Sequence, residues 1–283
     1  MKSNWYSIAG VTLEIRSESE IQQNGRLYQF ACDACEPDIF VRLISGKPLP
    51  ETDGQLLFTD GRRTVFEKDG ERRSYCRYFD ALEKRYVPYA CLIGTEKEYT
   101  LYLNYNGGEV WDTMMLDALD FPDILLSFGA AVMHGSFIIK NGKAVLFTAD
   151  KQVGKSTQAA LWEKYAGAKI INGDRAAIRQ ENGKLYAYGI PYCGSSDICE
   201  NEKAPVAAIV ELTQGKKNEL SVLSPAAAFR CILGKLTYHV QDKDKARLAA
   251  DMAASASQLA VYHLSCLPEE SAVTLLEEAI WKR

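Results

Sequence analysis

The segment from residue 144 to residue 157 constrains the fold more than any other part of the chain. It opens with the apolar run Ala144–Thr148, continues through a short loop, and reaches Gly154-Lys155-Ser156-Thr157 just before a stretch with helical spacing. A buried strand, a tight loop and a helix that opens on Lys-Ser are typical of phosphate-binding loops. In such loops the backbone N–H groups at the helix N-terminus face an anion. The pattern predicts an α/β domain built around a phosphate site.

Each residue type in this loop has a physical reason to be there. Gly154 lets the backbone approach an anion closely, and Lys155 is a mobile cation that reaches the β- and γ-phosphate oxygens. Ser156 offers a short hydroxyl ligand for Mg²⁺. We expect Val153, Gly154, Lys155, Ser156 and Thr157 to contact a bound nucleotide.

The loop departs from the strict G-x-x-x-x-G-K-[ST] pattern at one position, because Ala149 stands where the first glycine belongs. Gly-Lys pairs are also common in this chain, beginning at Gly46, Gly142, Gly154, Gly183, Gly215 and Gly234. Only the pair at Gly154 is followed by Ser or Thr and lies between a buried strand and a helix. The alternative is a strand-to-helix turn with a coincidental lysine.

A second candidate segment follows the next apolar run. Asn172-Gly173-Asp174-Arg175 comes directly after the predicted strand Ala168–Ile171. An acidic side chain at the end of this strand would lie beside the phosphate loop, where it could bind Mg²⁺, orient a water or accept a hydroxyl proton. Arg175 could neutralise phosphate charge. The alternatives are an ordinary Asn-Gly-Asp turn for Asp174 and a surface salt bridge for Arg175.

The composition excludes several classes of protein. Of the 283 residues, 33 are Lys or Arg and 37 are Asp or Glu, so the formal net charge is −4 and a broad nucleic-acid-binding surface is not expected. We find no apolar run of the roughly 18 residues that a membrane helix needs and no apolar core of a signal peptide near the N-terminus. We therefore expect a cytoplasmic protein with no membrane partner, whose eight cysteines are reduced thiols.

Two regions differ in their patterning, and together they predict an α/β chain, α+β overall, with residues 1–110 forming a β-rich N-terminal region. Its short runs are rich in aromatic and β-branched residues and are separated by turn dipeptides such as Asp69-Gly70. The strands expected here are Val11–Arg16, Leu27–Ala31, Ile39–Ile44, Leu56–Thr59, Thr64–Lys68, Ser74–Phe79, Val87–Ile93 and Tyr99–Tyr105.

Residues 111–283 form the expected nucleotide-binding domain. Two helices separated near Pro122 are predicted within Trp111–Met133, and an Asn141-Gly142 turn between two strands precedes the phosphate loop. The remaining expected strands are Phe137–Lys140, Ala144–Thr148, Ala168–Ile171, Ala176–Arg179, Leu185–Tyr188 and Ala207–Leu212, and the expected helices are Thr157–Tyr165, Pro225–Leu233, Lys243–Ser257 and Ala272–Trp281.

From about Met133 to Leu267 these motifs, in this order, resemble the HPr kinase/phosphorylase family and its kinase-like relatives, whose fold is shared with ATP-type phosphoenolpyruvate carboxykinases. The resemblance rests on the segments His134-Gly135, Gly154-Lys155-Ser156-Thr157, Gly173-Asp174-Arg175, the G-x-P-[WY]-x-G-like loop Gly189–Ser195, Ala204-Pro205 with the strand after it, and Leu223-Ser224-Pro225. The order and spacing of these pieces carry the resemblance.

The resemblance implies transfer of the ATP γ-phosphoryl group to a hydroxyl, which in family members belongs to a serine of a protein. It assigns Lys155 to the phosphates, Ser156 and Asp174 to Mg²⁺, and His134 to the neighbourhood of the acceptor. The departure is Gly173, where the family has the aspartate proposed to accept the proton. Three possibilities follow: Asp174 is both metal ligand and base, His134 accepts the proton, or no phosphoryl group is transferred.

The function expected from the sequence is thus an ATP- and Mg²⁺-dependent kinase acting on serine in a protein or peptide, with Asp174, His134, Lys155 and Arg175 as catalytic residues. The hexamers of the family suggest a homo-oligomer. One alternative is a nucleotide-binding regulatory or scaffold protein without transferase activity, and another is a small-molecule kinase. The pair Cys32 and Cys35 is interpreted as ordinary strand or turn cysteines, with redox or zinc chemistry as the alternative.

Overall fold

A computed structural model describes residues 1–150 and 153–281. The chain forms two compact units, Met1–Ile124 and Leu125–Arg283, which are described separately below. The mixture of sheets and helices confirms the α+β class and the β-rich character of the first region. Among the described residues, no helix has both the length and the apolar character needed to cross a membrane.

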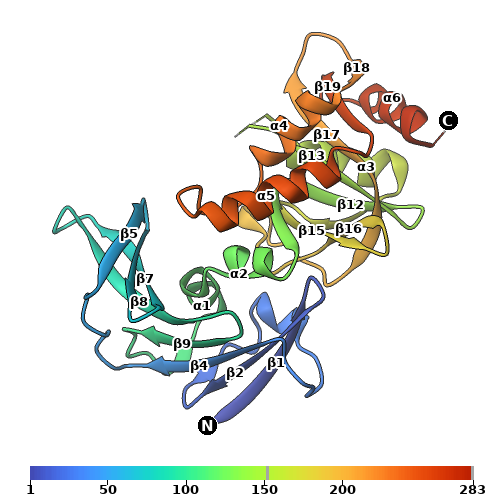
Figure 1. The fold of residues 1–283 in the computed structure, drawn as a ribbon. Coiled ribbons are helices and arrows are strands. Elements are labelled where there is room, and N and C mark those ends of the chain that lie inside the picture. The colour runs from blue at the N-terminus through green and yellow to red at the C-terminus, as the bar shows by residue number, and fades with distance from the viewer. Residues whose placement is uncertain (151–152, 282–283) are drawn as a thin grey trace. The chain divides into compact units, whose positions relative to one another are not determined.

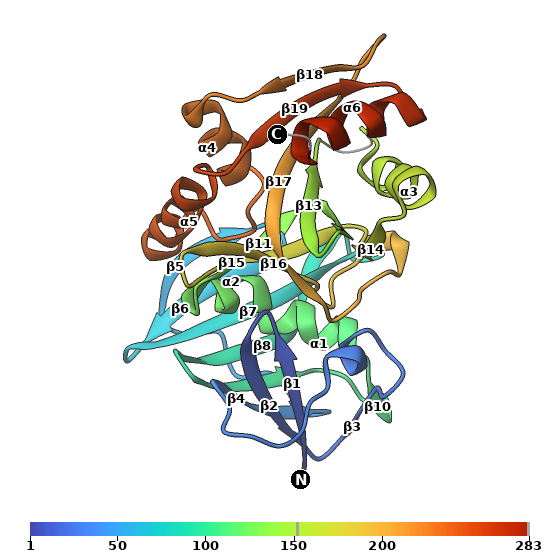
Figure 2. The ribbon, with the colours of Figure 1, turned by 90° about the vertical axis from the view of Figure 1, so that its right-hand side faces the viewer.

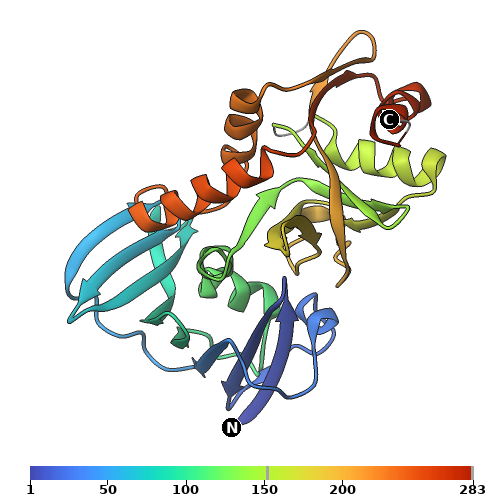
Figure 3. The ribbon, with the colours of Figure 1, turned by 45° about the vertical axis from the view of Figure 1, so that its right-hand side comes forward.

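The N-terminal unit is built on one eight-stranded sheet with the strand order β1-β2-β4-β9-β8-β7-β6-β5 (Figures 1 and 3). Its strands are β1 (Lys2–Ile8), β2 (Val11–Ser17), β4 (Ile39–Ser45), β5 (Gln55–Asp60), β6 (Arg63–Lys68), β7 (Glu71–Asp80), β8 (Arg85–Thr95) and β9 (Glu98–Leu103). A small parallel pair, β3 (Glu20–Ile21) with β10 (Glu109–Val110), the 3₁₀ turn η1 (Leu27–Phe30) and helix α1 (Asp112–Leu119) complete the unit.

Tight turns set the register of the hairpins in this sheet. Asp69 and Gly70 have φ values of 54° and 78°, so the predicted turn between β6 and β7 has both central residues in the left-handed region. That geometry matches the right-handed twist of the flanking strands and favours Asp-Gly. The expected hairpin is confirmed.

Helix α1 packs on the sheet through its buried Met115, Leu116 and Leu119. The Arg63 guanidinium, from β6, donates to the carbonyl oxygens of Asp117 (2.5 Å) and Ala118 (3.3 Å) at the end of the helix. The last carbonyls of a helix lack intrahelical partners, so this buried cation stabilises the C-terminus of α1.

One expected strand of this unit is wrong, because Leu27–Phe30 is a turn of 3₁₀ helix. The backbone N–H of Leu27 donates to the buried Asp112 carboxylate (2.8 Å), and Leu27 and Phe30, three residues apart, are both fully buried. An i, i+3 pair lies on one side of a 3₁₀ turn, whereas it would face opposite sides of a strand.

The C-terminal unit contains a nine-stranded mixed sheet in which the order β11-β15-β16-β17-β13-β12-β14 continues through β19 and β18, attached at β17. Its strands are β11 (Ala130–His134), β12 (Ser136–Lys140), β13 (Lys143–Thr148), β14 (Lys169–Asn172), β15 (Arg175–Glu181), β16 (Lys184–Tyr188), β17 (Lys203–Gln214), β18 (Glu219–Val222) and β19 (Val261–Cys266). Its helices are α3 (Lys155–Ala166), α4 (Pro225–Leu233), α5 (Lys243–Ala256) and α6 (Glu270–Trp281), while α2 (Phe121–Ser127) spans the boundary between the units and η2 (Gly194–Ser196) is a 3₁₀ turn.

Helices cover both faces of the strands next to β13, which explains why β13 is almost continuously apolar. Val145 and Phe147 point to the core that contains Trp162 of α3 and Leu276 of α6. Ala144 and Leu146 point to the opposite core, which α4 and α5 complete. Figure 2 shows α4 and α5 on one side of β13 and β17, and α3 on the other. The strand period of two therefore divides its side chains between two hydrophobic layers, and β13 is held rigidly from both sides.

Two expectations for this unit are wrong. Ala130–Met133 was expected to be helical but forms most of β11: all four residues are buried, so the run carries no helical periodicity, and Gly129 (φ 77°) ends α2 before it. The break between the first two helices is at Asp120 (φ 54°), and Pro122 lies in the first turn of α2, where its missing N–H costs nothing.

Candidate phosphate-binding site

The loop between β13 and α3 ends at Gly154, which has φ 115° and ψ 27° and immediately precedes the helix. This left-handed conformation favours glycine, which has no Cβ. Among the described residues no side chain caps the N-terminus of α3, and the first turn of this helix holds no acidic residue. The first N–H groups of a helix have no intrahelical acceptor, so they leave positive potential at this end of the helix. Lys151 and Gln152 of the predicted loop lie outside the described residues.

The Lys155 side chain folds back over this loop. Its Nζ lies 3.5 Å from the carbonyl oxygens of Ala149 and Asp150. Burial lowers the pKa of Lys155, Asp174 acts in the opposite direction, and Lys235 adds to the lowering. The ammonium group is thus held over the loop. An anion bound there would offset the free energy that desolvation of the ammonium group costs.

The neighbouring residues fit the predicted roles in different ways. Ser156 and Thr157 are exposed on the first turn of α3. The Ser136 hydroxyl donates to the Lys155 carbonyl oxygen (3.1 Å) and fixes the start of the helix on β12. The side chain of Val153 packs against the core between β13 and α3, so it anchors the loop and leaves only its backbone for a ligand.

His134, Asp174 and Arg175 are brought together by the pairing of β11 with β15, which places His134 opposite Arg175. His134 Nε2 lies 3.2 Å from Asp174 Oδ1, and Arg175 Nε lies 3.4 Å from Asp174 Oδ2. The hydrogen bond from His134, together with the charges of Arg175 and Lys155, lowers the pKa of Asp174 against the effect of burial. Arg175 also stacks over the ring of Tyr192 (5.7 Å).

Asn172 fixes the turn that presents Asp174, a role that was not predicted from the sequence. It is fully buried; its Oδ1 accepts the backbone N–H groups of Asp174 (3.0 Å) and Arg175 (2.9 Å), and its Nδ2 donates to the Ile190 carbonyl oxygen (2.9 Å). Such side-chain hydrogen bonds to the following backbone stabilise turns. The Asn-Gly-Asp sequence signalled a turn, but the partner Ile190 lies 18 residues away.

Ser196 occupies the space beside Gly173. A Cβ added at Gly173 would lie 2.5 Å from the Ser196 Cβ and would also overlap its Oγ. The Ser196 hydroxyl donates to the Cys193 carbonyl oxygen (2.7 Å), so η2 is held in this position. Gly194 of the same turn packs against Asp174, where a Cβ would lie 2.9 Å from the carboxylate carbon. Gly173 is the position at which the sequence departs from the family that it resembles. The η2 turn fills the space that a side chain at this position would need.

This packing predicts that Gly173→Asp destabilises the protein. Because the clash is with a short, hydrogen-bonded side chain, we expect the free energy of unfolding to fall by about 1–3 kcal/mol, the usual cost of overpacking. Ser196→Gly should recover part of the loss in the double variant, since the two residues are in contact. Denaturant unfolding of the two single variants and the double variant measures this coupling; strictly additive effects would contradict the assigned contact.

Lys235 is a second cation at the loop, and it too was not predicted. Its Nζ lies 2.6 Å from Asp150 Oδ1; the lysine side chain is 18% exposed and that of Asp150 is 89% exposed. The Lys235 carbonyl oxygen accepts the backbone N–H of His134 (2.8 Å), and Leu236 bridges to Met133 in β11. The segment after α4 is thus attached to the strand that carries His134, and it brings Lys235 next to the loop.

The depressed pKa of Asp174 predicts how stability depends on pH. A carboxylate whose pKa is lower in the folded state stabilises the protein fully above its unfolded pKa of about 3.9, and this contribution is lost as the pH falls through the folded pKa. We expect Asp174→Asn to lower the unfolding free energy by about 1 kcal/mol at pH 7. The difference should shrink below about pH 4; a difference that stays constant down to pH 2.5 would show that the carboxylate charge is not responsible.

The residues present fit a magnesium ion that is bound together with phosphates. Within the described part of the chain, no three His, Cys, Asp or Glu side chains gather into a metal cage. Mg²⁺ is usually held by one or two carboxylates together with substrate phosphates and waters, so the Ser156 hydroxyl and the Asp174 carboxylate are an adequate protein donor set.

Of three comparisons with known proteins, two find no match and one finds a distant structural similarity. No family model matches the sequence, and no curated protein matches it. Among solved structures, the chain is similar to the Hpr(Ser) kinase/phosphatase from Coxiella burnetii, with 16% sequence identity over 53% of this chain and 93% of that one and a TM-score of 0.28. A TM-score this low assigns neither a family nor an activity to the chain.

Proposed function

We propose that the C-terminal unit binds ATP with Mg²⁺ and transfers the γ-phosphoryl group to a hydroxyl. The observation that carries this proposal is the N-terminus of α3, which no side chain in the described part of the loop caps, with the Lys155 ammonium folded over the loop in front of it. A helix N-terminus and a lysine directed at the same point form a phosphate-binding arrangement.

The other charged side chains have roles consistent with phosphoryl transfer. Lys155 and Lys235 neutralise phosphate charge, and Lys235 exchanges the exposed Asp150 carboxylate for a phosphate oxygen. In the transfer, the bond between the γ-phosphorus and the oxygen bridging to the β-phosphate breaks, and ADP leaves. A new bond forms between phosphorus and the acceptor oxygen, whose proton passes to the Asp174 carboxylate. A loose transition state depends on positioning and charge more than on a strong base, so a carboxylate with a depressed pKa suffices.

His134 and Arg175 position this carboxylate, because each interacts with a different oxygen of Asp174. Ser156 and Asp174 would hold the Mg²⁺ ion, which neutralises charge on the phosphates when bound. The acceptor class, a serine of a protein or peptide, comes from the sequence resemblance described above, as does the assembly into a homo-oligomer. A cytoplasmic location is proposed with it.

A transfer assay tests this function. The protein is incubated with Mg²⁺ and ATP labelled in the γ-phosphate on an array of peptides that differ in the residues around one serine, with alanine replacing the serine in matched peptides. Label that requires both the serine and Lys155 supports the kinase. Release of free phosphate alone, with no labelled peptide, would remove serine transfer from the proposal.

A second candidate is a nucleotide-binding protein that transfers nothing. The position of Ser196, in the space that a side chain at residue 173 would need, favours it, because the packed η2 turn leaves no room for a second acid beside Asp174. The two candidates differ in one measurement: both bind Mg²⁺-ATP through Lys155, but only the kinase yields ADP together with a phosphorylated serine peptide in a single turnover.

A further inference from the structure

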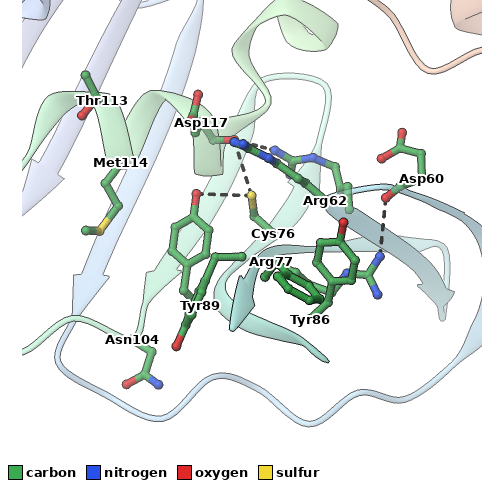
Figure 4. Close-up of a pocket in the computed structure, with 13 residues that line it drawn as sticks. Asp60, Arg62, Cys76, Arg77, Tyr86, Tyr89, Asn104, Thr113, Met114 and Asp117 are labelled. Carbon is green, nitrogen blue, oxygen red and sulfur yellow. Dashed lines mark hydrogen bonds between the residues drawn. The ribbon is translucent and has the colours of Figure 1, made fainter. Parts of the chain in front are cut away.

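The N-terminal unit contains a cavity of about 840 Å³ that the phosphate site does not use (Figure 4). The β5–β6 turn, strands β7 and β8, the residue after β9 and helix α1 line it, so every wall belongs to one unit. This volume lies within the range of ligand-binding pockets. It is too large to be a packing defect of a well-folded sheet.

Aromatic side chains form one wall of this cavity. Tyr78, Phe79 and Tyr86 are 49%, 56% and 45% exposed, although side chains of this size are usually buried on a sheet of this kind. Phe79 and Tyr86 face each other across β7 and β8 in an edge-to-face pair (5.4 Å). Beyond the cavity, Leu82 at the tip of the hairpin is 95% exposed.

A β-bulge sets the position of a further aromatic ring. The pairing of β7 with β8 runs from Cys76 opposite Ala90 to Arg77 opposite Pro88, so Tyr89 is an extra residue on β8. Its ring lines the cavity, and its hydroxyl accepts a hydrogen bond from the Cys76 thiol (3.3 Å). Bulges often redirect side chains at binding sites.

The lining contains Arg62, Arg63 and Arg77, which differ in how many of their hydrogen-bond donors already have partners. Arg63 is used by the end of α1, as described above. Arg62 is exposed, and among the described residues its guanidinium has no hydrogen-bond or ion-pair partner. Arg77 lies over the ring of Tyr86 (5.2 Å), and its Nη2 donates to the carbonyl oxygens of Asp60 (3.5 Å) and Gly61 (3.3 Å), so it holds the β5–β6 turn in place. The lining also contains two acidic residues, Asp60 and Asp117, each of which interacts with other residues of the structure.

We propose that this cavity binds a peptide segment that presents an aromatic side chain next to a carboxylate. The ring stacks against Phe79 and Tyr86, which share one face of the hairpin, and the carboxylate accepts hydrogen bonds from the exposed Arg62 guanidinium. The occupant is a peptide because the exposed apolar side chains of this hairpin are not confined to the cavity lining and include Leu82 at its tip. Tyr, Phe, Met and Arg are also the residues enriched in the cores of protein interfaces.

This proposal does not depend on phosphoryl transfer, and a selection with the full-length protein tests it. A random heptapeptide library displayed on phage is enriched on the wild type, and the strongest binder is synthesised and titrated by fluorescence anisotropy. We expect an enriched motif with Phe, Tyr or Trp within two positions of Asp or Glu. Arg62→Glu and Tyr86→Ala should each weaken binding of that peptide at least tenfold.

The matched control is Lys97→Glu, a charge reversal in the β8–β9 turn of the same sheet that does not line the cavity. It should leave the affinity within twofold of wild type, and melting temperatures should show that all three variants fold. The proposal is overturned if no motif is enriched, if the motif lacks an acidic residue, or if the selected peptide binds Arg62→Glu and Tyr86→Ala as well as wild type.

Discussion

Lys155→Ala should abolish the stabilisation of this protein by Mg²⁺-ATP. A ligand that binds only the folded state at 100 times its dissociation constant adds about 2.7 kcal/mol, which corresponds to a rise in melting temperature of roughly 5–10 °C for a unit of this size. Without the ammonium group held over the loop by Ala149 and Asp150, we expect a rise below about 1 °C at the same ATP concentration. Thermal unfolding followed by circular dichroism measures both.

Lys164→Ala is the control for this prediction. It removes a lysine from the last turn of the same helix, where the ammonium group lies over the ring of Tyr165 and not at the loop. The variant should keep the full ATP-dependent rise. If Lys155→Ala kept it as well, the nucleotide would bind elsewhere, and the assignment of the α3 N-terminus would be wrong.

The second large effect is expected for Asp174→Asn. The amide cannot take up the acceptor proton, so single-turnover transfer should fall by about 10²–10⁴, the usual contribution of a general base. Binding of ATP without Mg²⁺ should change by only a few-fold, because Asp174 neither caps α3 nor contacts the loop carbonyls. Glu200→Gln, which removes a surface carboxylate paired with Lys169, should leave both quantities unchanged.

If Asp174→Asn transfers at the wild-type rate, then His134 is the candidate proton acceptor. Its Nε2 lies 3.2 Å from Asp174, so it is the nearest other group able to take a proton. In that case His134→Gln, and not Asp174→Asn, should produce the loss.

Local pattern was sufficient to predict the strand, loop and helix at the centre of the candidate site. Neighbouring residues are enough to predict the buried strand β13, the glycine before α3 and the position of Ser156 in the first turn. A buried strand and the start of a helix can each be recognised from about a dozen consecutive residues. Helix α4 was predicted with its observed bounds because Ser224 caps it and Pro225 begins it.

The remaining parts depend on contacts between distant residues, which local pattern does not contain. His134 and Asp174 are 40 residues apart, and only the resemblance to a known family brought them together before the structure did. Lys235 belongs to one of six Gly-Lys pairs, and nothing around it in the sequence separates it from the other five. What distinguishes Lys235 is a contact in the structure: its carbonyl oxygen accepts the backbone N–H of His134 in β11. Ser196 likewise becomes relevant only because η2 packs on Gly173.

The errors in secondary structure have a related cause. Residues 130–133 are apolar at every position, so neither the helical nor the strand period is visible in them. The pairing with β15 decides in favour of a strand. Leu27–Phe30 turns because Asp112, 85 residues away, accepts its first N–H.

Calorimetric titration with ATP and with AMP, both in excess Mg²⁺, tests the central claim most directly. If Lys155, Lys235 and the N-terminus of α3 bind the β- and γ-phosphates, ATP should bind with one site per chain, and AMP, which lacks those phosphates, should bind at least about 100-fold more weakly, a difference of about 2.7 kcal/mol. No heat from ATP at millimolar concentration, or equal affinities for ATP and AMP, would contradict the assignment of a phosphate-binding loop.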